Sequence, residues 1–80
     1  MIRYHLKKLI SDWEYDHGRH LSITELAKGT GVNRSSLSRI SSQKGYNTTT
    51  ENLNRICSFF SCEIQELVEF IPDENDQQGS

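Results

Sequence analysis

The sequence predicts a small all-α domain of five short helices, with short extended segments at its two ends. Three observations support this prediction. Apolar residues recur at helical spacing in five successive stretches. Two of these stretches are separated only by a glycine-containing turn, the arrangement that joins two tightly packed helices. The chain has 80 residues, of which 34% are hydrophobic, and this suffices for one modest core and one domain.

The first helix is expected to begin by Lys7 and to end at Gly18, because glycine tolerates the left-handed backbone that closes a helix. Its apolar stripe consists of Leu6, Leu9, Ile10 and Trp13. In front of it, Ile2 and Tyr4 alternate with polar residues, as in a strand. We therefore expect an extended segment before the first helix.

Residues 22–42 contain the two helices joined by a turn. Ser22 is a typical N-cap, and Glu25 three residues later would complete a capping box. Ala27 is small enough to let another helix cross closely. Gly31 stands where the chain must reverse, because it adopts a left-handed conformation at little cost.

The second helix of this unit has two different faces. Asn33 can cap its start. The inner face is apolar, with Val32, Leu37 and Ile40. The outer face is polar and basic, and it consists of Arg34, Ser35, Ser38, Arg39 and Ser42.

A polar loop around Gly45 precedes a threonine cluster, residues 48–50. Thr48 with Glu51 offers a second capping box, and hydroxyls at a helix N-terminus also suit a phosphate. The fourth helix is marked by Leu53, Ile56, Cys57 and Phe60, and the fifth by Ile64, Leu67 and Val68. Phe59 falls beside the stripe and is a candidate for a partner surface.

The chain ends in a strand-like alternation over residues 68–71, and Pro72 closes the ordered domain, residues 1–72. Residues 73–80 are acidic and lack apolar side chains, so we expect a disordered tail.

The charge is unevenly distributed, although the net charge is −2. From Lys28 to Arg55 the chain carries five basic residues against Glu51 alone, whereas residues 63–76 carry six acids and no base. We interpret this as a basic face with an acidic rear and tail. The alternative, plain solvated helix faces, stays open on charge alone.

Other classes of function find little support in the sequence. Cys57 and Cys62 lack the second pair of a zinc ribbon and are interpreted as reduced thiols. His17 and His20 flank Gly18, so we expect no metal site. We expect no catalytic site, cofactor or small-molecule ligand, and no membrane span or signal peptide; the expected location is the cytoplasm.

The positions of Ala27, Gly31, Val32, Leu37 and Ile40 make the stretch resemble the helix-turn-helix of lambda-repressor-like (Xre family, Cro-type) transcriptional regulators. The similarity extends more loosely from Leu6 to Pro72. Ser61 departs from the pattern, because relatives often have glycine after the fourth helix.

The resemblance implies a sequence-specific regulator of double-stranded DNA, most simply a repressor, whose second motif helix lies in the major groove. Carried over by position, base reading falls to Asn33, Arg34, Ser35 and Arg39 and extends to Ser38 and Ser42. The phosphate-contacting candidates are Thr24, Lys28, Gln43, Lys44, Thr48, Thr49 and Thr50. A protein-interaction adaptor or an antitoxin-like autoregulator on the same fold remains an alternative.

A single copy offers few contacts, so we expect a homodimer on a pseudo-palindromic operator. The strand-like ends, residues 2–6 and 68–71, could pair with each other within one chain or between two. Phe59 and Phe70 could supply the apolar centre of a dimer contact.

Overall fold

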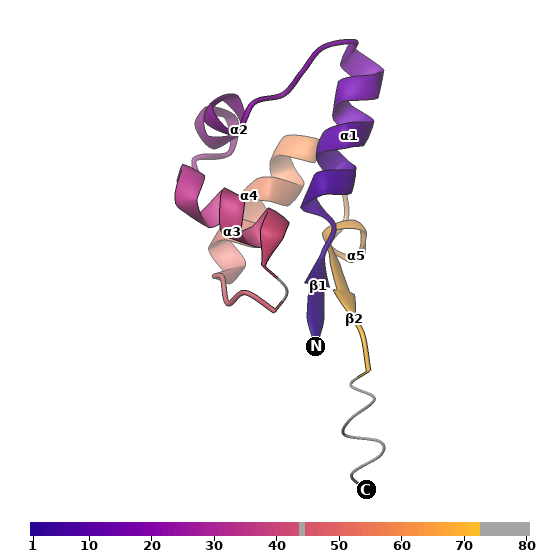
Figure 1. Ribbon diagram of the computed structural model, residues 1–80, viewed down its shortest axis with the longest axis vertical. Helices are drawn as coiled ribbons and strands as arrows, with labels where there is room; N and C mark the ends of the chain where they lie inside the picture. The colour runs from indigo at the N-terminus through magenta and orange to yellow at the C-terminus, as the bar shows by residue number, and fades with distance from the viewer. Residues whose placement is uncertain (44, 73–80) are drawn as a thin grey trace, which may run out of the picture.

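The computed structural model describes residues 1–43 and 45–72 (Figure 1). The elements follow in the order β1 (Ile2–Tyr4), α1 (Leu6–His17), α2 (Ile23–Thr30), α3 (Arg34–Ser42), α4 (Thr50–Phe60), α5 (Ile64–Leu67) and β2 (Val68–Phe70). The prediction of five helices with extended ends is thereby confirmed over the described part of the chain. Lys44 and the expected tail, residues 73–80, lie outside the described residues.

Three helices end in a left-handed residue. Gly18 closes α1 with φ 66°, and Gly31 closes α2 with φ 80°, both as expected. Ser61 closes α4 with φ 53°, and it is the one non-glycine residue with positive φ in the described ranges. The departure at Ser61 therefore falls on a position whose backbone favours glycine.

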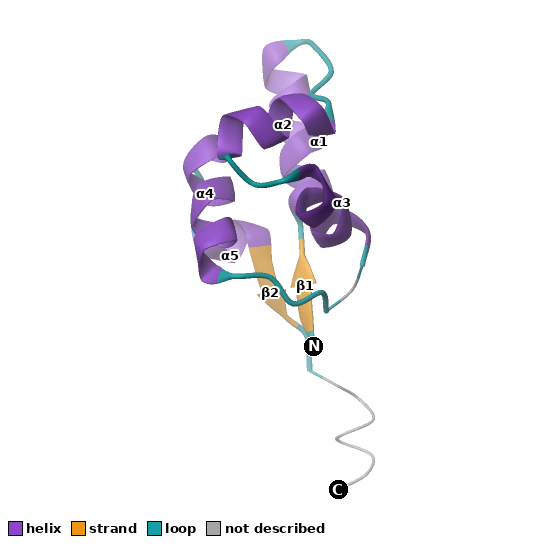
Figure 2. Ribbon diagram, turned by 90° about the vertical axis from the view of Figure 1, so that its left-hand side faces the viewer, coloured by secondary structure: helices purple, strands orange, loops and turns teal. Residues whose placement is uncertain are grey.

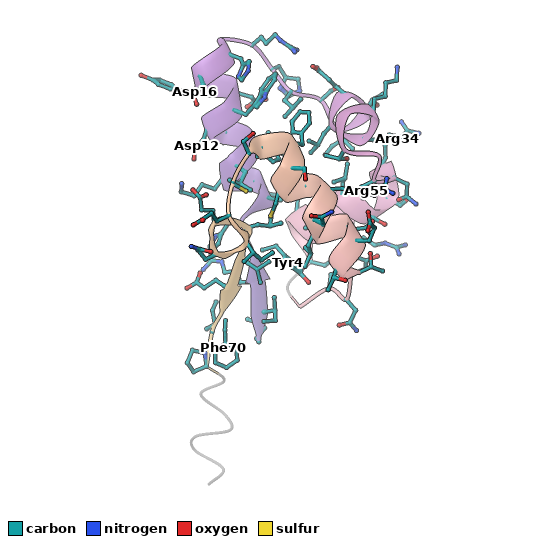
Figure 3. All side chains as sticks on the ribbon, turned by 180° about the vertical axis from the view of Figure 1, so that it is seen from behind. Tyr4, Asp12, Asp16, Arg34, Arg55 and Phe70 are labelled. Carbon is teal, nitrogen blue, oxygen red and sulfur yellow. The ribbon has the colours of Figure 1, made fainter. Side chains whose placement is uncertain are left out.

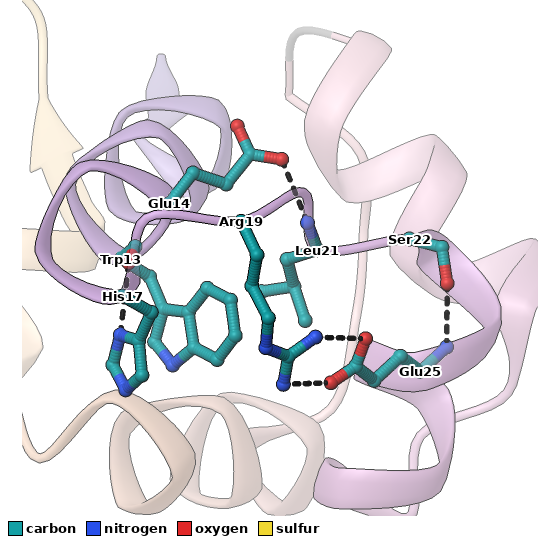
Figure 4. Close-up of polar contacts among 7 residues, drawn as sticks. All are labelled: Trp13, Glu14, His17, Arg19, Leu21, Ser22 and Glu25. Carbon is teal, nitrogen blue, oxygen red and sulfur yellow. Dashed lines mark hydrogen bonds and ion pairs between the residues drawn. The ribbon is translucent and has the colours of Figure 1, made fainter.

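Neither of the two predicted capping boxes is complete in the structure. Ser22 Oγ accepts a hydrogen bond from Glu25 N at 3.1 Å, but the Glu25 carboxylate accepts two bonds from Arg19 instead of returning to Ser22 (Figure 4). On α4 the N-cap is Thr49, whose Oγ1 accepts from Asn52 N at 3.1 Å. The Thr48–Glu51 box was therefore misplaced by one residue, because either neighbouring hydroxyl can cap.

The core is formed by residues of all five helices, of the link before α2 and of the turn between α2 and α3. Its buried members are Leu6, Leu9, Leu21, Leu26, Val32, Leu37, Ile40, Ile56 and Leu67. Phe59 is half-buried and packs on this core, with its ring 6.4 Å from that of Trp13. The expectation that Phe59 lies on a partner surface was therefore wrong: α4 turns it toward α1 and α2.

The two ends of the chain form an antiparallel pair, with Ile2 opposite Phe70 and Tyr4 opposite Val68. Pairing therefore occurs within one chain. The loop after α3 is attached to β1, because Tyr4 Oη donates to Tyr46 O at 2.8 Å and Gly45 N donates to Ile2 O at 3.2 Å. This attachment places β1 and the start of α1 beside the end of α3 (Figures 1 and 2).

Candidate nucleic-acid interface

The turn between α2 and α3 is held by a buried threonine. Thr30 is only 7% exposed; its hydroxyl donates to Leu26 O at 2.8 Å and accepts from Val32 N at 3.1 Å. It thus satisfies the backbone on both sides of Gly31, and α3 leaves the turn in a fixed direction. The sequence reasoning did not identify Thr30, because a threonine at a helix end gives no signal of burial.

The outer face of α3 is open to solvent. Arg34, Ser35, Ser38, Arg39 and Ser42 are all exposed, as predicted. Arg34 points away from the helical body (Figure 3). Asn33 is exposed as well, but its Oδ1 accepts from Ser36 N at 2.8 Å, so the side chain also serves as the N-cap.

A shallow groove of about 580 Å³ runs between the start of α2 and the outer face of α3. It is lined by Ile23, Thr24, Arg34, Ser35, Ser38 and Arg39. A neighbouring hollow joins Lys28 on α2 to Asn33 and Arg34. The fold therefore brings together most base-reading candidates with two of the phosphate candidates.

The other phosphate candidates lie around the start of α4 and the end of α3. Gln43, Thr49 and Thr50 are exposed. Thr48 is half-buried, and its Oγ1 accepts from Asn52 Nδ2 at 3.1 Å, so its hydroxyl is already bonded. Nothing places Lys44, which falls outside the described residues.

Arg55 differs from the other basic residues of the motif. Its Nε donates to Glu51 Oε2 at 2.8 Å, and its Nη1 lies 3.4 Å from Gly31 O. It thus links α4 to the turn and is compensated by Glu51. The positive charge of the face comes instead from Lys28, Arg34 and Arg39.

Arg19 is likewise structural. It donates to both carboxylate oxygens of Glu25, at 3.0 and 2.6 Å, and lies 4.8 Å over the Trp13 ring (Figure 4). The Arg19 hydrogen bonds lower the pKa of Glu25. On the same link, Glu14 Oε2 accepts from Leu21 N at 2.8 Å. These bonds fix α2 relative to α1 and therefore the groove beside α3.

The acidic residues of the C-terminal part of the chain, as far as the structure describes them, lie on elements outside this face. Glu63 is the N-cap of α5, Glu66 belongs to α5, and Glu69 belongs to β2; both elements lie to the right of α3 in Figure 1. The division into a basic face and an acidic rear stays a prediction, because other described acids lie on α1, α2 and α4.

The two cysteines are free thiols, as expected. Burial, and next the proximity of Cys57, raise the pKa of Cys62 to about 11, which favours the protonated thiol. Residues 1–43 and 45–72 contain no group of three or more potential metal ligands. Over the same residues, no helix has the length and apolarity needed to cross a membrane.

Two capped helices around a left-handed glycine, with the second exposing a polar and basic face, define a helix-turn-helix DNA-binding unit. The family model of the Cro/C1-type HTH DNA-binding domain matches residues 13–73, and the chain belongs to this family. The assignment makes it a DNA-binding regulator whose partner is double-stranded DNA. A search of curated proteins found no match.

Proposed function

We propose that this protein is a sequence-specific transcriptional regulator that reads the major groove with α3 and represses by occupying promoter DNA. The observation that carries the proposal is the outer face of α3. It is exposed along its length and presents two arginines that no acid of the described chain neutralises. Guanidinium groups in such a position can bond guanine bidentately.

Base reading is assigned to Arg34 and Arg39, with Asn33 and the serines Ser35, Ser38 and Ser42 beside them. Because the cap occupies Asn33 Oδ1, that residue offers mainly its amide donor to a base. Ser41 and Ser42 both donate their hydroxyls to Ser38 O, at 2.9 and 2.8 Å. The Ser42 hydroxyl oxygen can therefore only accept a hydrogen bond from DNA, or the side chain contacts DNA without a hydrogen bond.

Phosphate contacts are assigned to residues on both sides of α3. Thr24 and Lys28 border it from α2, and Thr49 and Thr50 stand at the start of α4, where backbone N–H groups favour an anion. Thr48, Gln43 and Lys44 complete the set predicted from the sequence. These contacts set the position of α3 in the groove without choosing the sequence.

A homodimer on a pseudo-palindromic operator completes the proposal. One α3 helix reads only a few base pairs, and two copies are needed for the specificity of a regulator. The reading face must stay free for DNA, so the contact between copies has to use another surface. The end of the β1–β2 sheet that carries Ile2 and Phe70 is exposed and lies outside the proposed reading face.

The experiment is a fluorescence anisotropy titration of the protein against random duplex DNA and against a duplex selected from a random library. We expect binding that weakens steeply between about 50 and 200 mM salt, with clear preference for the selected duplex. The double variant Arg34→Gln with Arg39→Gln should lose that preference. Absence of salt-dependent binding to any duplex would contradict the proposal and favour the adaptor function.

A further inference from the structure

A second basic hollow lies beside the far end of α3, outside the groove already described. It has a volume of about 330 Å³ and lies between β1 with the start of α1 on one side and the end of α3 on the other. The first wall carries Arg3, Lys7 and Lys8, and the second carries Ser41, Ser42 and Gln43. The hollow therefore joins the N-terminal segment to the same helix that we propose reads DNA.

The basic side chains of this hollow differ in whether an acid neutralises them. His5 Nε2 lies 2.7 Å from Glu69 Oε1, and Lys8 Nζ lies 3.0 Å from Asp12 Oδ2. Arg3 and Lys7 have no acid within ion-pair distance among the described residues. They are the available cations of the hollow.

The same distinction applies to the whole described chain. Its lysines and arginines without an acid partner are Arg3, Lys7, Lys28, Arg34 and Arg39. Each of these five lines one of three hollows that border α3. The uncompensated charge of the described residues thus surrounds one helix, and Arg3 and Lys7 extend it beyond the motif.

Local electrostatics does not explain the position of Lys7. It lies in the first turn of α1, a turn without any acidic residue, where the helix dipole disfavours a cation. The arrangement costs stability in the free protein, and an anion bound between Lys7 and Arg3 would offset that cost. Both residues also precede the segment matched by the family model, residues 13–73.

We propose that Arg3 and Lys7 bind a backbone phosphate of the DNA that flanks the base pairs contacted by α3. This inference deepens the proposed function and depends on it. A helix in the major groove has a phosphate backbone on each side. Thr24 and Lys28 face one backbone, and the hollow at the end of α3, which Ser42 shares with the reading face, faces the other.

The test compares Lys7→Gln and Arg3→Gln with Ser58→Glu. Each variant lowers the net charge by one, but Ser58 is exposed on α4, which lies behind α3 (Figure 1). Affinity for random duplex DNA is measured by anisotropy over a series of salt concentrations. We expect Lys7→Gln and Arg3→Gln to weaken binding several-fold for every sequence and to lower the salt slope by about 0.9 or less, since both hold one phosphate. Ser58→Glu should leave the slope unchanged, and thermal melting should show all three variants folded.

The outcomes separate the two proposals. If the wild type binds no duplex, the proposed function fails and this inference fails with it. If the wild type binds with a steep salt slope and the Lys7 and Arg3 variants keep that slope, the phosphate site alone is overturned. Replacing chloride by inorganic phosphate at equal ionic strength adds a competitor for the same site. A loss of DNA affinity in the wild type that is absent from Lys7→Gln would support the assignment, because free phosphate can weaken binding through Lys7 only if DNA uses that site.

Discussion

Arg39 and Arg55 belong to the same basic stretch of the sequence, yet their surroundings give them different tasks. Arg55 is compensated by Glu51 and reaches the carbonyl of Gly31, so its charge is used within the fold. Arg39 is exposed on α3 without an acid partner in the described chain. A count of charges cannot make this distinction, because it depends on which side chains the fold brings together.

Arg39→Ala should weaken binding to a selected operator by about 1 to 3 kcal/mol and relax the preference at one base pair, the size of a lost bidentate contact. Lys28→Ala, at a phosphate position, should weaken all sequences alike and lower the salt slope by about 0.9. Competition with duplexes that carry single base-pair changes distinguishes the two. An equal loss on operator and random DNA would remove Arg39 from the base-reading set.

Ser61→Gly should stabilise the domain by about 0.5 to 1 kcal/mol. The left-handed backbone at φ 53° costs an L-residue about 1 to 2 kcal/mol, and the greater freedom of glycine in the unfolded chain offsets part of the gain. Urea denaturation measures the difference.

Gly18→Ala is the matched control for that prediction. Gly18 has the similar φ of 66°, and a Cβ there would meet nothing within 4 Å. Its substitution should therefore destabilise by about 1 kcal/mol through backbone conformation alone. If both variants shifted stability in the same direction, backbone conformation would not be the cause.

At the scale of elements, the crossing of α2 over α4 depends on Gly29. A Cβ on Gly29 would lie 2.8 Å from Cδ1 of Phe59 and closer still to Cε1. The sequence reasoning assigned the close approach to Ala27, which is half-buried against the core. Gly29 is a second position where α4 comes close, because the ring of Phe59 occupies the space that a Cβ would need.

Gly29→Ala should therefore destabilise the domain by up to about 2 kcal/mol. In an ordinary helix this change stabilises by about 1 kcal/mol, but overpacking against Phe59 costs about 1 to 3 kcal/mol. In a Phe59→Leu background the same substitution should become neutral or favourable. A double-mutant cycle in urea measures the coupling, and additive effects would show that the two residues do not compete for space.

The order and type of the elements followed from the sequence because their signals are local. Ser22, Gly31 and Asn33 each act on backbone groups within four residues, and they act as predicted. The N-cap of α4 was misplaced because Thr48 and Thr49 are chemically alike. The capping box at Ser22 and Glu25 is only half formed for a different reason. The Glu25 carboxylate accepts two hydrogen bonds from Arg19, six residues away, instead of one from the backbone of Ser22.

The candidate interface was predictable to a similar extent. Periodicity alone indicates which side of α3 faces outward, and the fold exposes those residues. The roles of Thr30 and Arg55 were not predictable, since each depends on contacts between segments. The hollow at Arg3 and Lys7 depends on the contacts between β1 and the loop after α3, which bring the N-terminal segment beside the end of α3.

At the scale of the whole molecule, the sheet carries an apolar end. Phe70 is 68% exposed and its cross-strand neighbour Ile2 is 38% exposed. Phe70 lies beyond the helical body (Figure 3). Within the described residues β2 pairs with β1 alone, so its other edge can accept the same strand of a second copy.

Phe70→Glu should therefore abolish or strongly weaken self-association, because it places like charges at the centre of the contact. Sedimentation velocity at micromolar concentration, with and without operator DNA, measures it. Tyr15→Glu is the control, since Tyr15 is 88% exposed on α1, away from the sheet. A dimer that withstands Phe70→Glu would place the contact elsewhere, and a wild type that stays monomeric on its operator would exclude the dimer.

The antiparallel pairing of β1 with β2 leads us to expect a particular order of folding. Ile2 and Phe70 can meet only after nearly the whole chain has been brought back on itself, whereas α2 and α3 meet across a turn of three residues. Closing the longer loop costs more chain entropy, so the strands should join late and separate first. Amide hydrogen exchange should accordingly be fast in residues 2–4 and 68–70 and slow in α2 and α3. The helix-turn-helix would then keep its structure while the N-terminal strand, with Arg3, opens and closes beside it.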